Sequence, residues 1–288
     1  IKSEEVALSL IQHLGVERKI KRGLYVFKGK ENVFEIMSRL ANGDYGYVPA
    51  KITIPEGYTV RKMADTYSEK LVDIKPEDFI KEADQYEGFL FPDTYFFYPY
   101  ATSGPVISAM LTNFENRLAP LKADFDIAAG SSTASTTMPD APLGTSSVIV
   151  AEYAQLYGPR DTRSILIMAS ILEKEVRTNA DKAMVADLFY RRMKEGMALQ
   201  ADSTLTYATG KTSAQLTTKD LRDASPYNSY TNRGLPPTPI SNPGLASIKA
   251  ALYPQRNNYV YFLSDNDGAT HFSVTFDEHK KAKEKYLR

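Results

Sequence analysis

Residues 164–178, SILIMASILEKEVRT, place apolar side chains at the spacing of one helix face. Turning successive residues by about 100° puts Ile165, Leu172 and Val176 in nearly the same direction. The pattern therefore predicts a core helix over 161–177. Because the chain has 288 residues, it can bury such a helix in a sizeable core, as one large domain or as two modest ones.

Two glutamates and a lysine lie inside this apolar run. On the helical wheel, Glu175 is roughly 60–80° to one side of the apolar direction and Glu173 roughly 100° to the other, while Lys174 points to solvent. One interpretation makes both glutamates boundary residues whose stems pack while their carboxylates reach water. The other places a carboxyl at the edge of a cleft, where partial desolvation raises its pKa and lets it donate a proton. Periodicity alone leaves both interpretations open.

The composition excludes several classes of function. Lys+Arg and Asp+Glu are equal at 35 each, which argues against a protein that binds duplex nucleic acid. The chain has no Cys and only three His, so disulfides and thiolate metal sites are excluded, and a multi-histidine metal site is not expected. Neither a Gly-rich phosphate loop nor a G-x-S-x-G motif is present.

The pattern along the chain predicts an α+β fold. Helices are expected at the C-terminus and over 4–14, 33–40, 60–71, 76–83, 106–118, 182–196 and 245–252, and strands over 23–27, 50–55, 257–265 and 270–274. The small, polar residues of 130–147 predict a flexible loop, and the proline-rich residues 225–244 a rigid, non-regular one. No stretch reaches the roughly 18–20 apolar residues of a membrane span. Because the sequence starts at Ile1 without an initiator Met, an N-terminal anchor or signal segment is expected to have been removed.

Polar and aromatic residues gather in two further stretches that are predicted to be irregular. Amides, hydroxyls and phenols of this kind are typical of carbohydrate clefts, although each residue taken singly is also typical of a turn or cap. The candidates for substrate binding are Gln200, Asp202, Thr204 and Tyr207 in LQADSTLTYATGK, and Tyr227, Asn228 and Tyr230 in SPYNSY. His271, on a predicted strand, is either structural or a hydrogen-bonding residue of the cleft wall.

Four stretches together resemble the YceG-like family of endolytic murein transglycosylases. They are EGFLFPDTYFF, ASILEKE, LQADSTLTY and SPYNSYTNRGLPPTPISNPGLASI, and the closing YVYFLSDNDGATHFSVTFDEH is similar to the end of that family as well. The resemblance runs from about residue 23 to the C-terminus and is broken by an insertion at about 122–160. The sequence departs from the family's common pattern at Ala201, Ser203 and Ala208.

The resemblance implies a domain organisation. It predicts an N-terminal α/β segment over 1–49, a small LysM-like β-α subdomain over 50–86, and a larger mixed α/β catalytic domain over 87–288 with a flexible insertion at about 122–160. It further implies a bacterial protein held in the cytoplasmic membrane by one N-terminal helix, with its catalytic part facing the cell wall. The expected partners are peptidoglycan strands and cell-wall synthases of the penicillin-binding type, and no nucleic acid is expected.

The resemblance also implies a reaction and a catalytic residue. The second glutamate of the E-K-E motif, Glu175, is expected to act as general acid and base, with Glu173 beside the substrate. The expected reaction cleaves the β-1,4 bond between N-acetylmuramic acid and N-acetylglucosamine and leaves 1,6-anhydro ends. This reaction calls for no metal or organic cofactor. Two alternatives remain. One is a hydrolytic muramidase that uses Asp202 or Glu173 as a second carboxylate. The other is a non-catalytic scaffold that binds peptidoglycan.

Overall fold

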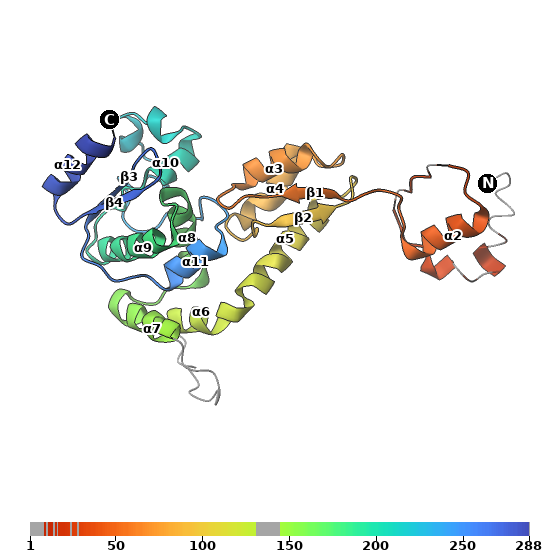
Figure 1. Ribbon diagram of the computed structural model, residues 1–288, viewed down its shortest axis with the longest axis horizontal. Coiled ribbons are helices and arrows are strands. Elements are labelled where there is room, and N and C mark those ends of the chain that lie inside the picture. The colour runs from red at the N-terminus through yellow and green to blue at the C-terminus, as the bar shows by residue number, and fades with distance from the viewer. Residues whose placement is uncertain are drawn as a thin grey trace.

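The computed structural model describes residues 9, 11–13, 15, 17–23, 25–27, 29–130 and 145–287 of the chain. Helices and strands are both present, as the predicted α+β class requires. Figure 1 shows an N-terminal part around helix α2 (Val33–Asn42), which an extended segment joins to a middle lobe and then to a larger C-terminal lobe. No described helix is both long enough and apolar enough to cross a membrane.

The middle lobe is built on a two-stranded antiparallel sheet. Strand β1 (Ala50–Thr53) pairs with β2 (Thr94–Phe97), and helices α3 (Val60–Ser68) and α4 (Pro76–Ala83) lie between them in the chain. Thr59 caps α3 by accepting a hydrogen bond from the N–H of Lys62. The buried apolar cluster of this lobe continues past residue 86 into α5 (Ser103–Leu118), as far as Met110.

The larger lobe is built around the predicted core helix. Helix α8 (Thr162–Glu175) begins after Asp161, whose side chain accepts the N–H of Ser164 at 2.7 Å. Every residue from Ile165 to Leu172 is buried, so α8 is buried on all sides at its centre and not on one face only. Helices α9 (Asn179–Lys194) and α11 (Leu245–Leu252) pack against it.

The expectation of a flexible insertion over 122–160 is wrong at its two ends. Residues Lys122–Ala128 form helix α6 and residues Thr145–Tyr157 form helix α7. Phe125 and Tyr153 from these helices are buried in the apolar core of the larger lobe. The two ends of the expected insertion are therefore helical because their apolar side chains pack into this core. Residues 131–144, where a flexible loop was expected, lie outside the described residues.

Two other segments differ from the sequence-based expectation. Residues Asp202–Thr209 form helix α10, where an irregular stretch was expected. The strand expected over 23–27 is not formed by its described residues, which have no regular structure. Of the helix expected over 4–14, residues 9 and 11–13 are described and are helical.

The predicted C-terminal strands and helix are formed, although the first strand, expected over 257–265, is shorter than predicted. Strands β3 (Tyr261–Ser264) and β4 (Thr270–Ser273) form an antiparallel hairpin, and helix α12 (Phe276–Tyr286) packs on both. Residues 225–244 form the predicted non-regular loop. Short 3-10 turns complete the described elements: η1 (Glu17–Lys19), η2 (Asp84–Tyr86), η3 (Ala119–Leu121), η4 (Ser213–Gln215) and η5 (Asp220–Arg222).

The proline-rich loop also joins the two lobes, through Asn242. Its side-chain oxygen accepts the N–H groups of Gly88 and Leu90, both at 2.9 Å. Its side-chain nitrogen donates to the carbonyl of Tyr58 at 3.0 Å and to the carboxylate of Glu87 at 2.6 Å. Because Asn242 is buried, these four hydrogen bonds fix the middle lobe against the larger one.

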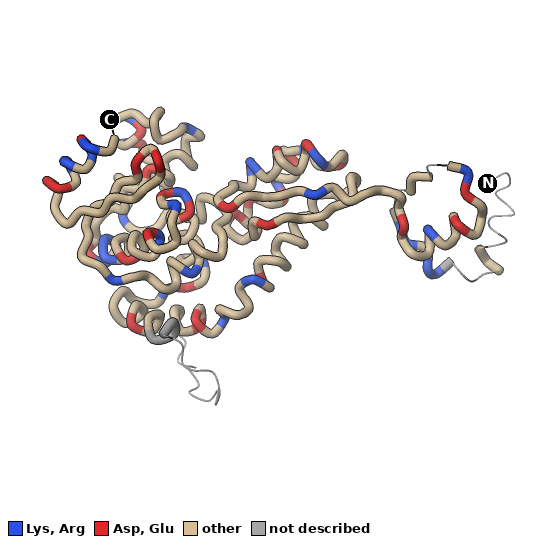
Figure 2. Tube along the Cα trace, in the orientation of Figure 1, with Lys and Arg blue, Asp and Glu red and all other residues tan. Residues whose placement is uncertain are grey.

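Basic and acidic residues are interspersed along the described parts of the chain (Figure 2). Neither lobe shows an extended stretch of a single sign in this view. This mixed distribution accompanies the formal net charge of zero.

Candidate active site

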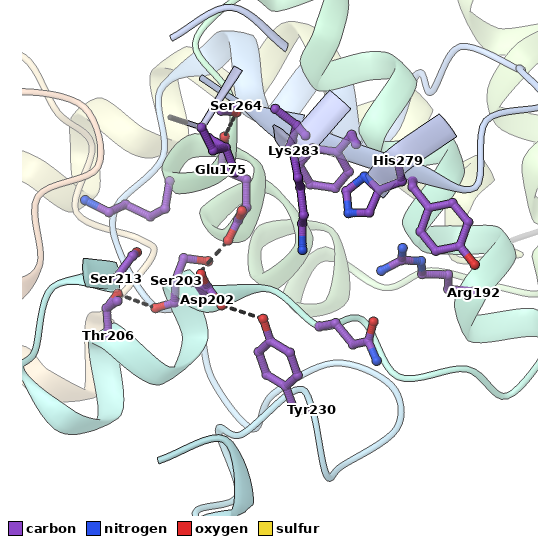
Figure 3. A pocket seen from close by; sticks show the side chains of 16 residues that line it. Glu175, Arg192, Asp202, Ser203, Thr206, Ser213, Tyr230, Ser264, His279 and Lys283 are labelled. Carbon is purple, nitrogen blue, oxygen red and sulfur yellow. Dashed lines mark hydrogen bonds between the residues drawn. The ribbon is translucent and has the colours of Figure 1, made fainter. Parts of the chain in front are cut away.

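A cavity of about 570 Å³ is lined by residues from the C-terminal end of α8 and from α9, α10, β3 and α12 (Figure 3). Its volume falls in the range of ordinary ligand sites. The residues that line it are Lys174, Glu175, Arg192, Gln200, Asp202, Ser203, Thr206, Ser213, Tyr230, Tyr261, Phe262, Leu263, Ser264, His279, Lys283 and Leu287.

Glu175 is the last residue of α8 and turns its half-buried side chain into this cavity (Figure 3). Its Oε1 accepts the backbone N–H of Ser203 at 3.1 Å, and its carbonyl accepts the hydroxyl of Ser264 at 3.0 Å. Burial raises the pKa of the Glu175 carboxyl and the charge of Asp202 raises it further, against the hydrogen bonds from Ser203, which lower it. Glu175 therefore keeps its proton to a higher pH than an ordinary glutamate and is suited to act as a general acid.

Glu173 has a different environment, although it is only two residues away. Its side chain is 9% exposed and forms an ion pair with Lys182, with Oε1 and Nζ 3.0 Å apart. Its other oxygen accepts the N–H of Gly244 at 3.0 Å and the hydroxyl of Ser247 at 2.6 Å, at the start of α11. Glu173 does not line the large cavity and contributes only to a smaller neighbouring one. The sequence predicts that Glu173 binds substrate. In the structure, however, both oxygens of its carboxylate already have partners within the protein.

Three predicted binding residues do share the cavity with Glu175. Asp202 begins α10, and its Oδ1 accepts the hydroxyl of Tyr230 from the proline-rich loop (Figure 3). Gln200 has a φ of 55°, a left-handed conformation that is uncommon for a residue other than glycine. Its N–H donates to the carbonyl of Ser229 at 3.0 Å, which ties this strained residue to the proline-rich loop.

Thr204 and Asn228 are fully buried and lie outside the cavity. The Thr204 hydroxyl donates to the carbonyl of Ala201 at 2.8 Å, and the Asn228 side chain donates to the carbonyl of Asp223 at 2.7 Å. The side-chain oxygen of Asn228 also accepts the N–H of Tyr230 at 3.0 Å. Both side chains thus support the backbone near the site, and the expectation that they line the cleft is wrong for this cavity.

Tyr207, Tyr227 and His271 also lie outside the cavity lining. The rings of Tyr207 and Tyr227 pack together with centroids 5.2 Å apart, and the Tyr227 hydroxyl lies 2.6 Å from that of Thr238. On β4, His271 pairs with Asp265, with Nε2 and Oδ2 2.7 Å apart, and its ring stacks on Tyr286. The structural interpretation of His271 fits this environment.

Sequence reasoning missed the basic residues of the cavity. Arg192 comes from α9, and His279 and Lys283 come from α12, one helical turn apart. The i, i+4 spacing of His279 and Lys283 is a signal that they share a face. Nothing in the sequence indicates that this face lines the same cavity as α8 and α10. Ser203 and Thr206 on α10 were missed because that segment was not predicted to be helical.

Among the described residues, no group of three or more His, Asp or Glu side chains is arranged to hold a metal ion. The cavity itself contains two carboxyl groups, those of Glu175 and Asp202. What the arrangement can do chemically is transfer a proton from Glu175 to a bound ligand, with hydroxyl, phenol and amide groups around it to hold that ligand.

The sequence is similar to one protein family and to several known proteins. The YceG-like family matches residues 1–285. The endolytic murein transglycosylase of Bacillus subtilis is 32% identical over 314 aligned residues, which cover 100% of this chain and 78% of that protein. The protein of the same name from Streptococcus pneumoniae is 24% identical over 305 aligned residues, which cover 91% of this chain but only 50% of that protein.

A solved structure is similar as well. The crystal structure of a yceG-like protein from Listeria monocytogenes matches with a TM-score of 0.64 and 29% identity, over 98% of this chain and 91% of that one. The family matches nearly the whole sequence, and the Bacillus protein is 32% identical over the full chain. The chain belongs to the YceG-like family.

Proposed function

We propose that this protein is a lytic transglycosylase that cleaves murein glycan strands internally, with Glu175 as its single general acid and base. The observation that carries the proposal is the half-buried Glu175, with a raised pKa, inside a cavity lined by hydroxyl, phenol and amide groups. The names of the Bacillus and Streptococcus relatives support the reaction class.

In the proposed reaction, Glu175 first protonates the oxygen that links N-acetylmuramic acid to N-acetylglucosamine. The bond from that oxygen to the anomeric carbon breaks, and the C6 hydroxyl of the muramyl residue bonds to the same carbon. The Glu175 carboxylate then accepts the proton of that hydroxyl, so the enzyme returns to its starting state. Because the nucleophile belongs to the substrate, proximity replaces the second carboxylate that ordinary glycosidases use.

The engaged carboxylates around Glu175 favour this mechanism over hydrolysis. Glu173 is held by Lys182, Gly244 and Ser247. Asp202 accepts a hydrogen bond from Tyr230, but it is close enough to raise the pKa of Glu175. A muramidase that uses Asp202 to activate water is therefore the second candidate.

Mass spectrometry of the products distinguishes the candidates. Purified protein is incubated with isolated glycan strands, and the new muramyl ends are identified. The proposed function predicts 1,6-anhydro ends, each lighter by one water than a hydrolysed end. Reducing muramyl ends would instead support the muramidase, and strands that are bound but never cleaved would support the non-catalytic scaffold.

We further propose that the middle lobe, which is LysM-like by sequence, helps to hold the strand beside the cavity. The hydrogen bonds of Asn242 fix this lobe close to α8 and give it a constant position relative to Glu175. NMR spectra recorded with soluble glycan fragments check this, because signals of residues 50–97 should shift together with those of α8. Unchanged signals over 50–97 would contradict it.

We also propose that the protein is anchored in the cytoplasmic membrane and contacts cell-wall synthases, since its proposed substrate lies outside that membrane.

A further inference from the structure

The cavity that contains Glu175 has a basic end as well as an acidic one. Arg192, His279 and Lys283 line the same space as Glu175 and Asp202 and come from α9 and α12. In Figure 3 their nitrogen-bearing ends face the region where Glu175 and Asp202 also point. The proposed proton transfer uses none of these three basic side chains.

The Nδ1 atom of the His279 ring is buried and has no hydrogen-bond partner among the described residues. The residue as a whole is 8% exposed. The ring stacks on Tyr261, with centroids 5.2 Å apart. Burial lowers the pKa of His279, and the nearby charges of Lys283 and Arg192 lower it further. A buried polar atom in this state costs free energy unless a ligand satisfies it.

Arg192 and Lys283 add positive charge to the cavity, and no ion pair with a described carboxylate holds either side chain. Arg192 is 8% exposed and donates to the carbonyls of Leu199 and Val260, while its Nε is buried without a partner among the described residues. Neither Arg192 nor Lys283 forms an ion pair with any residue in the described ranges. Burial of a guanidinium without an ion-pair partner among the described residues is costly, so an anion that enters this end of the cavity gains both electrostatic attraction and hydrogen bonds.

We propose that Arg192, His279 and Lys283 form an anion subsite for a carboxylate carried by the lactyl arm of muramic acid. This inference rests on the proposed function, because muramic acid is the sugar whose anomeric bond is cleaved. Its lactyl arm belongs to the same ring as that bond, so a ring placed beside Glu175 brings the arm into the same cavity. The carboxylate is either that of the arm itself or that of a peptide attached to the arm.

Binding experiments test the subsite without requiring turnover. The isotope-labelled protein is titrated by NMR with N-acetylmuramic acid and with its methyl ester, which has nearly the same shape but no charge. The acid should bind roughly tenfold more tightly than the ester, since charge-assisted hydrogen bonds are stronger than neutral ones. The preference should weaken as salt is added, because Lys283 is exposed.

Two variants and one control assign this preference to the named residues. His279→Leu removes a ring whose Nδ1 has no partner in the described structure, and Lys283→Ala removes an exposed side chain, so both should fold. Each should lose most of the preference for the acid. Lys280→Ala is the matched control, because Lys280 lies on the same helix, pairs with Asp277 and does not line the cavity.

A second pair of ligands identifies the source of the carboxylate. A muramyl peptide with free peptide carboxylates is compared with the same compound in amidated form. A preference for N-acetylmuramic acid over its ester, without a preference between the peptides, assigns the subsite to the lactyl carboxylate. A preference only between the peptides assigns it to the attached peptide.

The results separate this inference from the proposed function. If strands are not cleaved but the acid is preferred in a way that depends on His279 and Lys283, the anion subsite stands and the transglycosylase proposal fails. Equal affinity for charged and neutral ligands in both pairs overturns the subsite, as does the absence of measurable binding. A preference that survives in both variants also overturns it.

Discussion

At the scale of single residues, Glu173 and Glu175 show how a helix separates two identical side chains. Residues two positions apart point about 200° away from each other. Glu173 consequently meets Lys182 and the start of α11, whereas Glu175 meets the cavity. Glu173 forms an ion pair with Lys182, whereas burial raises the pKa of Glu175, so that Glu175 keeps its proton to a higher pH than an ordinary glutamate.

The effect of Asp202 on the pKa of Glu175 can be measured. Its negative charge raises the pKa of Glu175, so Asp202→Asn should lower that pKa toward the ordinary glutamate value. Since Glu175 must be protonated to act as an acid, the alkaline limb of the pH–rate profile should move to lower pH in this variant. Asp73→Asn, at an exposed position in the middle lobe, should leave the profile in place. Loss of all turnover at every pH would instead identify Asp202 as an essential second carboxylate.

At this scale the sequence predicts part of the cavity lining, and the reason for each residue that lies outside it is local. Glu175, Gln200, Asp202 and Tyr230 share the cavity as predicted. Thr204 has the same kind of polar side chain, but its hydroxyl is used by a neighbouring carbonyl and by Ser229. Residue type shows what a side chain can bind, and only the backbone around it shows whether that capacity is already used.

At the scale of elements, Glu173 connects three helices of the larger lobe. Its carboxylate at the end of α8 pairs with Lys182 of α9 and accepts hydrogen bonds from the first turn of α11 and its N-cap. A carboxylate at a helix N-terminus is also favoured by the helix dipole. Both members of the ion pair are nearly inaccessible, with 9% and 4% of their side chains exposed.

Glu173→Gln should therefore act on stability. The substitution leaves Lys182 buried without its counter-ion, which should cost about 3 kcal/mol in the free energy of unfolding. Replacing Lys182 by Met in the same chain should recover much of this loss, because no buried charge then remains. Urea titration of the three variants measures both effects. Glu195→Gln, at the exposed C-cap of α9, is the control. A Glu173→Gln chain as stable as the parent would contradict the structural role.

The accuracy of the predicted elements follows the strength of their local signals. Helix α8 combines a capping Asp161 with a continuous apolar run, and its predicted bounds are nearly those observed. Helix α10 is short and rich in Thr, a residue of low helix propensity, so only its C-cap at Gly210 indicates a helix. Helix α12 is predicted, but its packing beside the cavity depends on the β3–β4 hairpin and on long-range contacts that local patterns do not describe.

At the scale of the whole molecule, the two lobes are joined by a polar contact in addition to the chain itself. Helix α5 leads from the middle lobe toward α6 and α7 (Figure 1), and Asn242 of the proline-rich loop binds backbone groups of the middle lobe. Nothing in the sequence at Asn242 indicates that its partners lie about residues 58 and 87–90. Contacts of such long separation are the ones that local patterns describe least.

Asn242→Ala should weaken the connection between the lobes. It leaves the buried N–H groups of Gly88 and Leu90 without their acceptor and the carboxylate of Glu87 with one donor fewer, which should cost about 3 kcal/mol or more. Chemical denaturation followed by circular dichroism measures the loss. The matched control is Asn232→Ala, in the exposed part of the same loop, which should cost less than about 1 kcal/mol. Equal, small effects of the two substitutions would show that Asn242 does not hold the lobes together.

The central claim is that one glutamate, Glu175, performs the proton transfers of strand cleavage. The most direct test compares the rates at which Glu175→Gln and Glu173→Gln release fragments from glycan strands, with the folded fraction of each variant measured in parallel. Glu175→Gln keeps the shape of the side chain but has no transferable proton, so its rate should fall by about two to four orders of magnitude while the fold is kept or slightly stabilised. Glu173→Gln, corrected for its folded fraction, should cleave at close to the parent rate. If folded Glu173→Gln is inactive while Glu175→Gln cleaves normally, the wrong glutamate has been assigned, and if both cleave normally, the proposed mechanism fails.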